Sequence, residues 1–399
     1  MQLNEPCLII DLNDNKFIFF VVTFNEKKDF KILKKITLDS VGVQNGHVIN
    51  VDTVSKLLKK TINIIEDEIS YFFSSVAIII NPNHINCLNV SGYKKLNGSQ
   101  VSSEDVVYIL NNIKKIILES ENNDSLIHLF NSNFSLDSDN LENLPIGLFG
   151  EFYNQNMTFF LVNKNILKNI KSVFSNCGLN IQKTILKPFA EGIYLLSNNQ
   201  LNKNVTILRL EENRINISLF KNKSYVFTED FNFGFALIIK DISKLCSLKI
   251  EEVKNFMREI ELKNIIETNS ESYLEKKYFY ISPYRKIKYQ LILDIINARI
   301  EELFEICYKK NINIKNLKNN DKIYIYVDSS EYYRNIQYVI ENSKLVALES
   351  IYDRDTAQTL SASVSGACEL ISKGWEKEAI PINHKNKSLI TRFFSRLFS

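Results

Sequence analysis

The chain has 399 residues, of which 45% are apolar and 24% are charged, and its formal net charge is +3. This length predicts two domains, or one large divided domain, with ample core. The nearly neutral charge gives no basis for bulk nucleic-acid binding, and six dispersed cysteines without a C-x-x-C pair argue against a disulfide framework or a zinc site. Such cysteines are typical of reduced, mostly buried thiols in a cytoplasmic protein.

The N-terminus has no basic region followed by an apolar run, so we expect no signal peptide. No apolar stretch reaches the length of a transmembrane helix. The four histidines are isolated in the sequence, and we assign none of them a catalytic or metal-binding role. They are His47, His84, His128 and His384.

The first 80 residues predict a sheet covered by helices. Apolar runs rich in Phe, Ile and Val predict strands at residues 7–11, 16–24, 31–38 and 76–80, and Asn13-Asp14-Asn15 predicts a turn. Between residues 52 and 72, apolar side chains recur every three or four positions, which predicts a helix with Asp52 as its cap. Three strands, a helix and a strand are typical of a helix-covered sheet.

Residues 83–156 predict a small inserted α+β subdomain. A strand is expected at 85–90, and Ser102-Ser-Glu-Asp105 predicts a capping box that starts a helix ending near Ser120. Two short strands are expected at 126–134 and 149–153, and a further buried strand at 157–162.

The rest of the chain repeats the opening order. A helix at 164–177 that ends at Gly178, a strand at 179–186 and a helix at 188–196 come first. Three strands then recur at 205–210, 216–220 and 225–231. Helices are expected at 235–245, 250–262 and 284–308, followed by a strand at 322–327, a helix at 333–342, a strand at 345–351 and an Ala/Ser/Gly-rich helix at 358–373.

This repetition predicts an internal duplication, the organisation of the two-lobed, ribonuclease H-like fold of actin-like ATPases. The expected fold class is α/β, with the α+β insert in the first lobe. The first lobe comprises residues 1–82 and 157–200, with 345–373 packing back onto it, and the insert comprises 83–156. The second lobe comprises 201–344, with a small helical subdomain at about 240–310. A linker at 374–386 leads to an amphipathic helix at 387–399.

The last 13 residues place apolar pairs four positions apart, so that the pairs stack on one side of a helix. The segment is too short to span a bilayer, and the pattern predicts a helix that lies in the membrane interface and favours anionic lipid. The alternative is a terminal helix packed on its own domain. The predicted membrane-binding residues are Leu389, Ile390, Arg392, Phe393, Phe394, Arg396, Leu397 and Phe398.

Several stretches resemble the bacterial cell-division protein FtsA, a family of the actin-like superfamily. They are Asn83-His84-Ile85-Asn-Cys87, Gly92, Ser102–Val106, Leu144-Pro-Ile-Gly-Leu-Phe-Gly150, Cys177-Gly-Leu179 and Pro188-x-Ala190. The resemblance spans essentially the whole chain and is strongest over residues 41–196. The terminal helix is also similar to the membrane-targeting sequence of this family.

The resemblance implies a peripheral protein on the cytoplasmic face of the inner membrane at the division site. The implied role is to tether the polymer of the tubulin-like protein FtsZ to the membrane and to help recruit the divisome at the septum. The implied partners are the FtsZ C-terminal peptide, other divisome proteins through the inserted subdomain, an anionic membrane surface, and further copies of the chain in a polymer or cluster, with no nucleic acid among them.

The family binds ATP between its lobes, but the three loops that hold the nucleotide depart from the family pattern. The first is Asp11-Leu-Asn13-Asp14, where the family has glycine and threonine. The second is Arg209-Leu-Glu211-Glu212-Asn213-Arg214, without glycines and with two acids that would repel a triphosphate. The third is Val327-Asp-Ser-Ser330, without the family's glycine pair. We therefore expect a pseudo-ATPase rather than an enzyme, with no certain cofactor.

Five residues match family positions near the phosphates or the nucleoside, and would hold ATP–Mg²⁺ if it binds. The alternative is that they are ordinary surface polar residues and a turn glycine. A site compensated by Arg209 and Arg214 also stays open. The five residues are Asp11, Lys16, Gly234, Glu251 and Lys254.

The resemblance also implies that the FtsZ peptide binds the second lobe near the helix at 284–308, through Asn297, Arg299 and Glu302. The alternative for Arg299 is an ion pair with Glu302 or Asp294 on its own helix. Three other functions stay open. They are an active ATPase or kinase of the actin-like superfamily, a pilus-assembly scaffold similar to PilM, and a soluble scaffold whose last helix is a packing element.

Overall fold

The computed structural model describes residues 5–198, 203–269, 272–317, 323–327, 335–336, 338, 340, 348–352 and 361–379. The chain divides into two compact units. The first unit comprises Met1–Lys203, Phe220–Thr228 and Leu360–Ser399, and the second comprises Asn204–Leu219 and Glu229–Thr359.

The first unit is built on a five-stranded sheet of order β11-β6-β1-β2-β3. Antiparallel pairs join β1 to β2 and β2 to β3, whereas β6 lies parallel to β1 and to β11. All six residues of β1 are buried, as expected for a strand covered on both faces. The strands are β1 (Cys7–Leu12), β2 (Lys16–Phe24), β3 (Phe30–Asp39), β6 (Ser75–Ile80) and β11 (Asn180–Leu186), beside a small pair β4 (Val43–Gln44) and β5 (His47–Val48).

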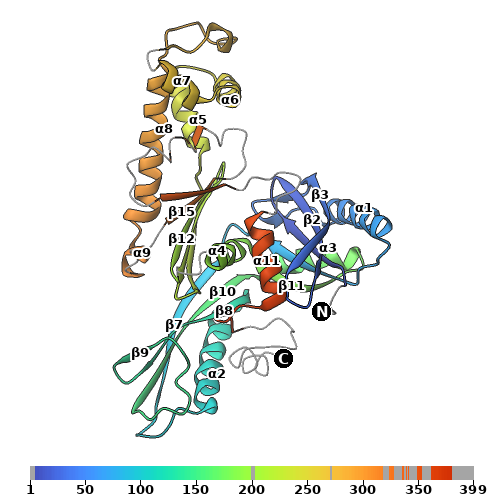
Figure 1. Cartoon of the computed structure of the whole chain (residues 1–399), viewed down its shortest axis with the longest axis vertical. Helices are drawn as coiled ribbons and strands as arrows, with labels where there is room; N and C mark the ends of the chain where they lie inside the picture. Colours follow the sequence, from blue (N-terminus) through green and yellow to red (C-terminus); the bar gives the residue numbers. More distant parts are fainter. Residues whose placement is uncertain are drawn as a thin grey trace. The chain divides into compact units, whose positions relative to one another are not determined.

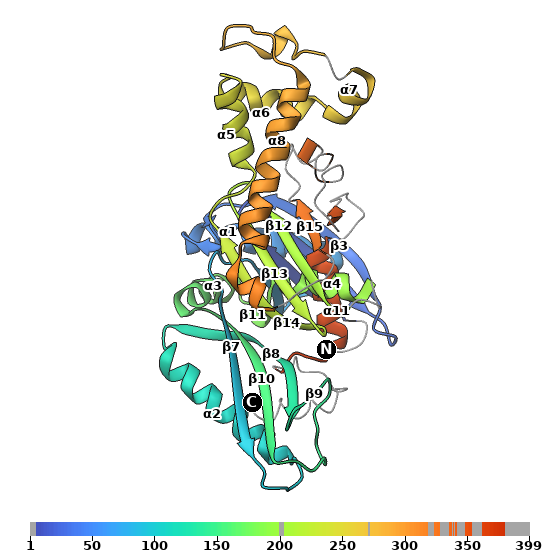
Figure 2. The same cartoon turned by 90° about the vertical axis from the view of Figure 1, so that its left-hand side faces the viewer.

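Two pairs of helices lie on opposite sides of this sheet (Figure 2). One pair is α1 (Val51–Ile69) and α3 (Lys164–Asn176), and the other is α4 (Lys187–Asn198) and α11 (Ala362–Lys373). As predicted, α3 ends before Gly178, which has a φ of +77°. The small residues of α11 allow it to pack closely on α4, because a Cβ on Gly366 would lie 1.8 Å from the carbonyl oxygen of Ala190 in α4.

The cap of α1 differs from the prediction. The Asn50 side chain accepts a hydrogen bond from the Thr53 amide at 3.0 Å, so Asn50 is the cap and Asp52 lies in the first turn. Both residue types favour the cap position, and the sequence alone did not separate them.

A second sheet of the first unit, of order β7-β10-β8-β9, is covered on one face by α2 (Ser103–Ser120) (Figure 2). Its strands are β7 (Asn86–Lys95), β8 (Asp124–Leu136), β9 (Asp139–Leu141) and β10 (Phe152–Asn163). The predicted capping box is present, since Ser102 and Asp105 bond each other's backbone amides. A Cβ on Gly92 of β7 would lie 2.4 Å from Ile109 of α2, so glycine allows the close packing there.

The prediction of two separate strands at 149–153 and 157–162 is wrong, because the single strand β10 spans this region. A register shift between Asn156 and Met157 interrupts the two-residue alternation that a strand normally shows in its sequence. The expected limit of the insert at residue 156 therefore falls inside a continuous strand.

The chain after α11 packs against β8, which corrects the prediction of a polar linker from residue 374. The Ala379 amide donates to the Leu129 carbonyl at 2.7 Å, and the Asn131 amide donates to the Lys377 carbonyl at 3.1 Å. Glu378 and Ala379 are buried. Residues 380–386 lie outside the described part of the chain.

The sheet β14-β13-β12-β15-β16 takes most of its residues from the second unit, and its strand order matches that of the first sheet. In each sheet three consecutive strands lie side by side, and the first of them pairs in parallel with a strand that comes much later in the chain. The strands are β12 (Val205–Leu210), β13 (Ile215–Lys221), β14 (Ser224–Phe231), β15 (Ile323–Val327) and β16 (Leu348–Tyr352). This repeat is the duplicated α/β architecture of actin-like ATPases, as predicted.

Helices of the second unit gather beyond one end of strands β12 and β15 (Figure 1). These are α5 (Ala236–Leu245), α6 (Ile250–Glu259) and α7 (Leu262–Asn269), with a 3-10 turn at Lys276–Tyr278. The helix α8 (Tyr289–Phe304) runs from there alongside the strands (Figure 1) and is followed by a π turn at Glu305–Lys309 and by α9 (Ile312–Leu317). The helix predicted from residue 284 begins only at Tyr289, because Ile287 accepts a hydrogen bond from the Leu274 amide and Lys288 pairs with Tyr273. Within the described residues, no helix combines the length and the apolar character needed to cross a membrane.

Candidate functional site

The first predicted nucleotide loop follows β1 and begins with Asp11, which is almost fully buried. Asp11 Oδ2 lies 3.5 Å from the Lys187 ammonium and accepts a hydrogen bond from the Ser363 hydroxyl at 3.3 Å. These partners come from the starts of α4 and α11, so the carboxylate is neutralised inside its own unit. Among the described residues, the other oxygen of Asp11 has no hydrogen-bond partner.

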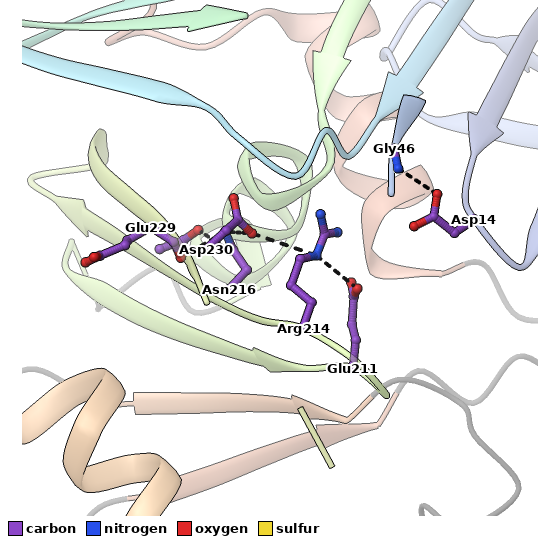
Figure 3. A network of polar contacts seen from close by, with 8 residues as sticks. Asp14, Gly46, Glu211, Arg214, Asn216, Glu229 and Asp230 are labelled. Carbon is purple, nitrogen blue, oxygen red and sulfur yellow. Dashed lines mark hydrogen bonds and ion pairs between the residues drawn. The ribbon is translucent and has the colours of Figure 1, made fainter. Parts of the chain in front are cut away.

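The rest of this loop is held by its own side chains. Asp14 Oδ1 accepts a hydrogen bond from the Gly46 amide at 2.6 Å (Figure 3), and its carbonyl accepts one from the Ser40 hydroxyl. Lys16 is exposed at the start of β2, and its carbonyl accepts a hydrogen bond from the Asn13 amide. The loop therefore directs the Asp14 carboxylate at the backbone of the turn between β4 and β5, at the position where the family's hydroxyl would face phosphate.

The second loop is a tight turn between β12 and β13, closed by a hydrogen bond from the Glu211 amide to the Arg214 carbonyl at 2.9 Å. The Arg214 side chain is buried between two acids (Figure 3). Its Nε lies 3.2 Å from Glu211 Oε2 and 3.8 Å from Asp230 Oδ1. Burial raises the pKa of Asp230 to about 6, although Arg214 and a hydrogen bond from Asn216 act against that rise.

Gly234 brings the start of α5 directly against this turn. A Cβ built on Gly234 would lie 2.1 Å from the Glu211 carbonyl oxygen. The next two amides donate to the turn, Phe235 to the Glu211 carbonyl at 3.1 Å and Ala236 to the Glu212 carbonyl at 2.8 Å. Helix N-terminal amides are ordinarily available to bind phosphate, and these two are taken by the protein's own backbone.

Of the five predicted cofactor residues, Gly234 and Lys254 come together at this turn. The Lys254 ammonium lies 3.5 Å from Glu212 Oε1, and Glu251 is exposed in the first turn of α6. Asp11 and Lys16 belong to the first unit. Each pair is therefore defined within its own unit.

The residues of the second loop do not fit a triphosphate. Two carboxylates lie at the turn, the Arg214 guanidinium already has acidic partners, and the two amides donate to carbonyls. Arg209, the other candidate for a compensated site, is buried within β12. In the third loop only Val327 is described, and residues 328–330 lie outside. The described chain holds no group of three or more His, Cys, Asp or Glu side chains arranged for a metal ion.

All three predicted partner-binding residues lie on α8. Arg299 donates to Asp241 of α5, and its Nη1 donates to Glu302 Oε2 at 2.6 Å. Asn297 is half-buried two residues before Arg299, and Asp294 accepts a hydrogen bond from Gln290. Arg299 thus has Glu302 as a partner, as the alternative interpretation expected, together with an acid from another helix.

A buried ionic cluster in the first unit was missed from the sequence. His128 Nδ1 lies 2.6 Å from Glu378 Oε1, and the Lys183 ammonium lies 3.4 Å from Glu378 Oε2. His128 Nε2 accepts a hydrogen bond from the Leu186 amide at 3.2 Å, so Nδ1 carries the proton of the neutral ring. Burial lowers the pKa of His128 and of Lys183. No local pattern could have found this cluster, since His128 and Glu378 are 250 residues apart.

No family model matches the chain. Sequence relatives are nevertheless found, and proteins named cell division protein FtsA are among them. The cell division protein FtsA of Buchnera aphidicola from Acyrthosiphon pisum is 18% identical over 306 residues, which are 77% of this chain and 73% of the relative. FtsA of Neisseria meningitidis serogroup B is 20% identical over 298 residues, 75% of this chain and 72% of the relative.

The chain resembles FtsA in sequence. This confirms the resemblance inferred from the motifs. A solved structure described as a PilM–PilN type IV pilus biogenesis complex matches with a TM-score of 0.55 at 11% identity, covering 93% of this chain and 98% of that chain. This likeness supports the actin-like fold. The terminal segment that resembles the FtsA membrane-targeting sequence lies outside the described residues, so its eight predicted membrane-binding positions stay a prediction.

Proposed function

We propose that this chain is an actin-like cell-division protein that tethers the FtsZ polymer to the cytoplasmic face of the inner membrane and helps recruit the divisome without hydrolysing ATP. The sequence relatives named cell division protein FtsA support the cell-division role. The single structural observation that carries the non-hydrolysing part is the turn between β12 and β13, whose charges and amides are satisfied within the protein.

The tether is the amphipathic helix predicted at 387–399. Six large apolar side chains contribute at most ~1.5–3 kcal/mol each on burial, and ordering the helix costs roughly 1–2 kcal/mol per residue. A single tail is therefore a weak and reversible anchor. Clustered tails bind strongly, because after one tail attaches the others act at high local concentration. A polymer or cluster of this chain would supply that arrangement.

The FtsZ C-terminal peptide is proposed to bind at α8 through Arg299, Asn297 and Glu302. Arg299 offers a planar, bidentate donor that suits a peptide carboxylate. Because Asp241 and Glu302 already engage it, an acidic peptide would have to compete with these two side chains. Binding at this site is therefore expected to be modest and sensitive to salt.

The proposal is tested by recruiting FtsZ to vesicles. The full chain should bring FtsZ polymers to vesicles that contain phosphatidylglycerol, and Phe393→Ser/Phe394→Ser should abolish recruitment. Phe72→Ser, which removes an exposed aromatic ring three residues after α1 ends, is the matched control and should recruit normally. A chain shortened after Ala379 keeps Glu378 with its partners and should behave like the double variant. Recruitment that survives loss of the tail would refute the tether, and in cells the same variants should lose a midcell ring.

A pilus-assembly role is the second candidate, because the PilM–PilN structure covers nearly the whole chain. It predicts binding of a membrane protein's N-terminal peptide and no need for the terminal helix. Vesicle recruitment that depends on Phe393 and Phe394 favours the division role.

The remaining alternative is an active ATPase or kinase, and a measurement of ATP hydrolysis with Mg²⁺ distinguishes it from the proposed non-hydrolysing protein. We expect none above background. A measurable rate that Glu212→Ala increases would show that the second loop still acts on nucleotide.

A further inference from the structure

The described residues between α7 and α8, 272–288, carry a concentrated positive charge, and we call them the basic loop. They contain five basic side chains and one acid, a net charge of +4, whereas the whole chain has +3. The rest of the chain therefore sums to −1. The basic residues are Lys276, Lys277, Arg285, Lys286 and Lys288, and the acid is Glu275, which lies 3.1 Å from Lys277. In both overall views the loop lies at the end of the second unit away from β12 and β15 (Figures 1 and 2).

Large apolar and aromatic side chains are exposed between these charges. Their exposed fractions are 43% for Tyr273, 56% for Tyr280, 49% for Ile281 and 46% for Tyr284. Lys286 lies over the Tyr273 ring at 5.9 Å from its centre. The surface thus alternates cations with amphipathic rings.

The loop has a built shape that presents these side chains outward. The buried Glu252 of α6 accepts hydrogen bonds from the amides of Ile281 and Ser282, at 2.7 and 2.8 Å, and from the Ser282 hydroxyl. Burial acts to raise the pKa of Glu252, but these bonds and one from the Lys249 amide lower it to about 2. On the inner side Leu274, Tyr278 and Ile287 are buried in the unit.

We propose that the basic loop binds anionic phospholipid headgroups, as a membrane contact separate from the terminal helix. Tyrosine rings favour the interface between headgroups and acyl chains, and each nearby Lys or Arg adds to the attraction of anionic lipid. The dispersed, outward-facing rings favour a lipid surface over an acidic peptide. This inference rests on the proposed membrane role and names a second surface for it. A weak amphipathic tail gains stable attachment when a basic patch joins it.

Charge variants in the full chain test the contact. Arg285→Gln/Lys286→Gln should weaken partitioning onto vesicles with 30% phosphatidylglycerol by about tenfold or more, from a contribution near 1 kcal/mol for each charge. The control Lys240→Gln/Lys244→Gln removes the same charge from exposed positions on α5 and should change partitioning less than twofold. Raising the salt concentration should erase the difference between the two variants. Equal losses in both variants would reduce the effect to net charge and refute a loop contact.

A local probe separates this proposal from the tail. Trp375 is the chain's only tryptophan, so Tyr280→Trp adds one reporter in the basic loop, and the parent chain serves as its background. On vesicles with brominated phosphatidylglycerol, the added emission should shift to the blue and be quenched. Unchanged emission from vesicle-bound protein overturns the loop contact even if the tail binds, as does failure of the chain to bind these vesicles at low salt. If the Phe393→Ser/Phe394→Ser variant still shows the quenching, the loop contact is supported and the proposal that the tail is required for membrane binding is wrong. If Arg285→Gln/Lys286→Gln loses only binding of a poly-glutamate peptide, the partner is an acidic protein and the lipid assignment is wrong.

Discussion

The Cα of Gly234 lies so close to Glu211 that a methyl group at position 234 would come within 2.1 Å of the Glu211 carbonyl oxygen. This approach lets the amides of Phe235 and Ala236 close the turn between β12 and β13. Gly234 matches a nucleotide-binding position in the family, but here the close packing of the turn is sufficient to explain why this position is glycine. It joins a helix start to a turn.

Gly234→Ala should destabilise the second unit, because the contact is with backbone that cannot rotate away. We expect a loss of about 3 kcal/mol in the free energy of unfolding, the upper end of the usual cost of overpacking, measured by urea denaturation. Gly147→Ala is the control, since its φ is +88° but no atom lies within 4 Å of the added Cβ. It should cost only about 1 kcal/mol, for backbone conformation. An equal effect at both positions would remove the steric argument.

Asp230→Asn should flatten the dependence of stability on pH. With a pKa raised from 3.8 to about 6, Asp230 keeps its proton in the folded state while the unfolded state has lost it. The folded state therefore binds more protons between pH 4 and 6, and its stability falls as pH rises through that window, by roughly 2–3 kcal/mol. Urea denaturation at pH 4, 5, 6 and 7 measures this fall. Asp67→Asn, at an exposed position on α1, should leave it in place.

Glu378→Gln should loosen the segment that follows α11. Removing the negative charge leaves Lys183 buried without its ion pair, which costs about 3–5 kcal/mol, while the amide oxygen of glutamine can still accept the hydrogen bond from His128. Emission from Trp375, three residues earlier, reports any release of the segment. Lys183→Met together with Glu378→Gln should recover part of the stability. Full stability of the single variant would contradict the ion-pair interpretation.

Asp241→Asn should strengthen binding of an FtsZ tail peptide if Arg299 is the contact. Asp241 competes for the guanidinium, and a surface ion pair of this kind is worth about 0.2–1 kcal/mol, so affinity should rise up to about fivefold. Arg299→Glu should abolish the gain. Fluorescence polarisation with a labelled peptide checks both, and an Arg299→Glu variant that binds unchanged excludes Arg299.

The sequence predicted the helices whose bounds are set by local side chains, and it failed where the bounds depend on residues distant in the chain. The apolar spacing placed α1, α2 and α3 to within a few residues, and the Ser102–Asp105 box and Gly178 marked helix ends. The late start of α8 depends on pairing between Ile287 and Leu274, which no helical period reveals.

The candidate site divides in the same way. Missing glycines in the second loop were visible in the sequence. The sequence did not show that Gly234 and Arg214 would complete that turn, because this depends on where α5 and Asp230 lie in the fold. The burial of Glu378 likewise depends on a histidine 250 residues away.

The hydrogen bond between Ala379 and Leu129 limits the length of chain between the first unit and the predicted terminal helix. If the chain were free from residue 374, 13 residues would precede the helix predicted at 387–399, whereas pairing at residue 379 leaves seven. Seven residues extend at most about 25 Å, against about 45 Å for thirteen. If residues 387–399 form the predicted membrane-bound helix, residue 379 must therefore lie within about 25 Å of that helix.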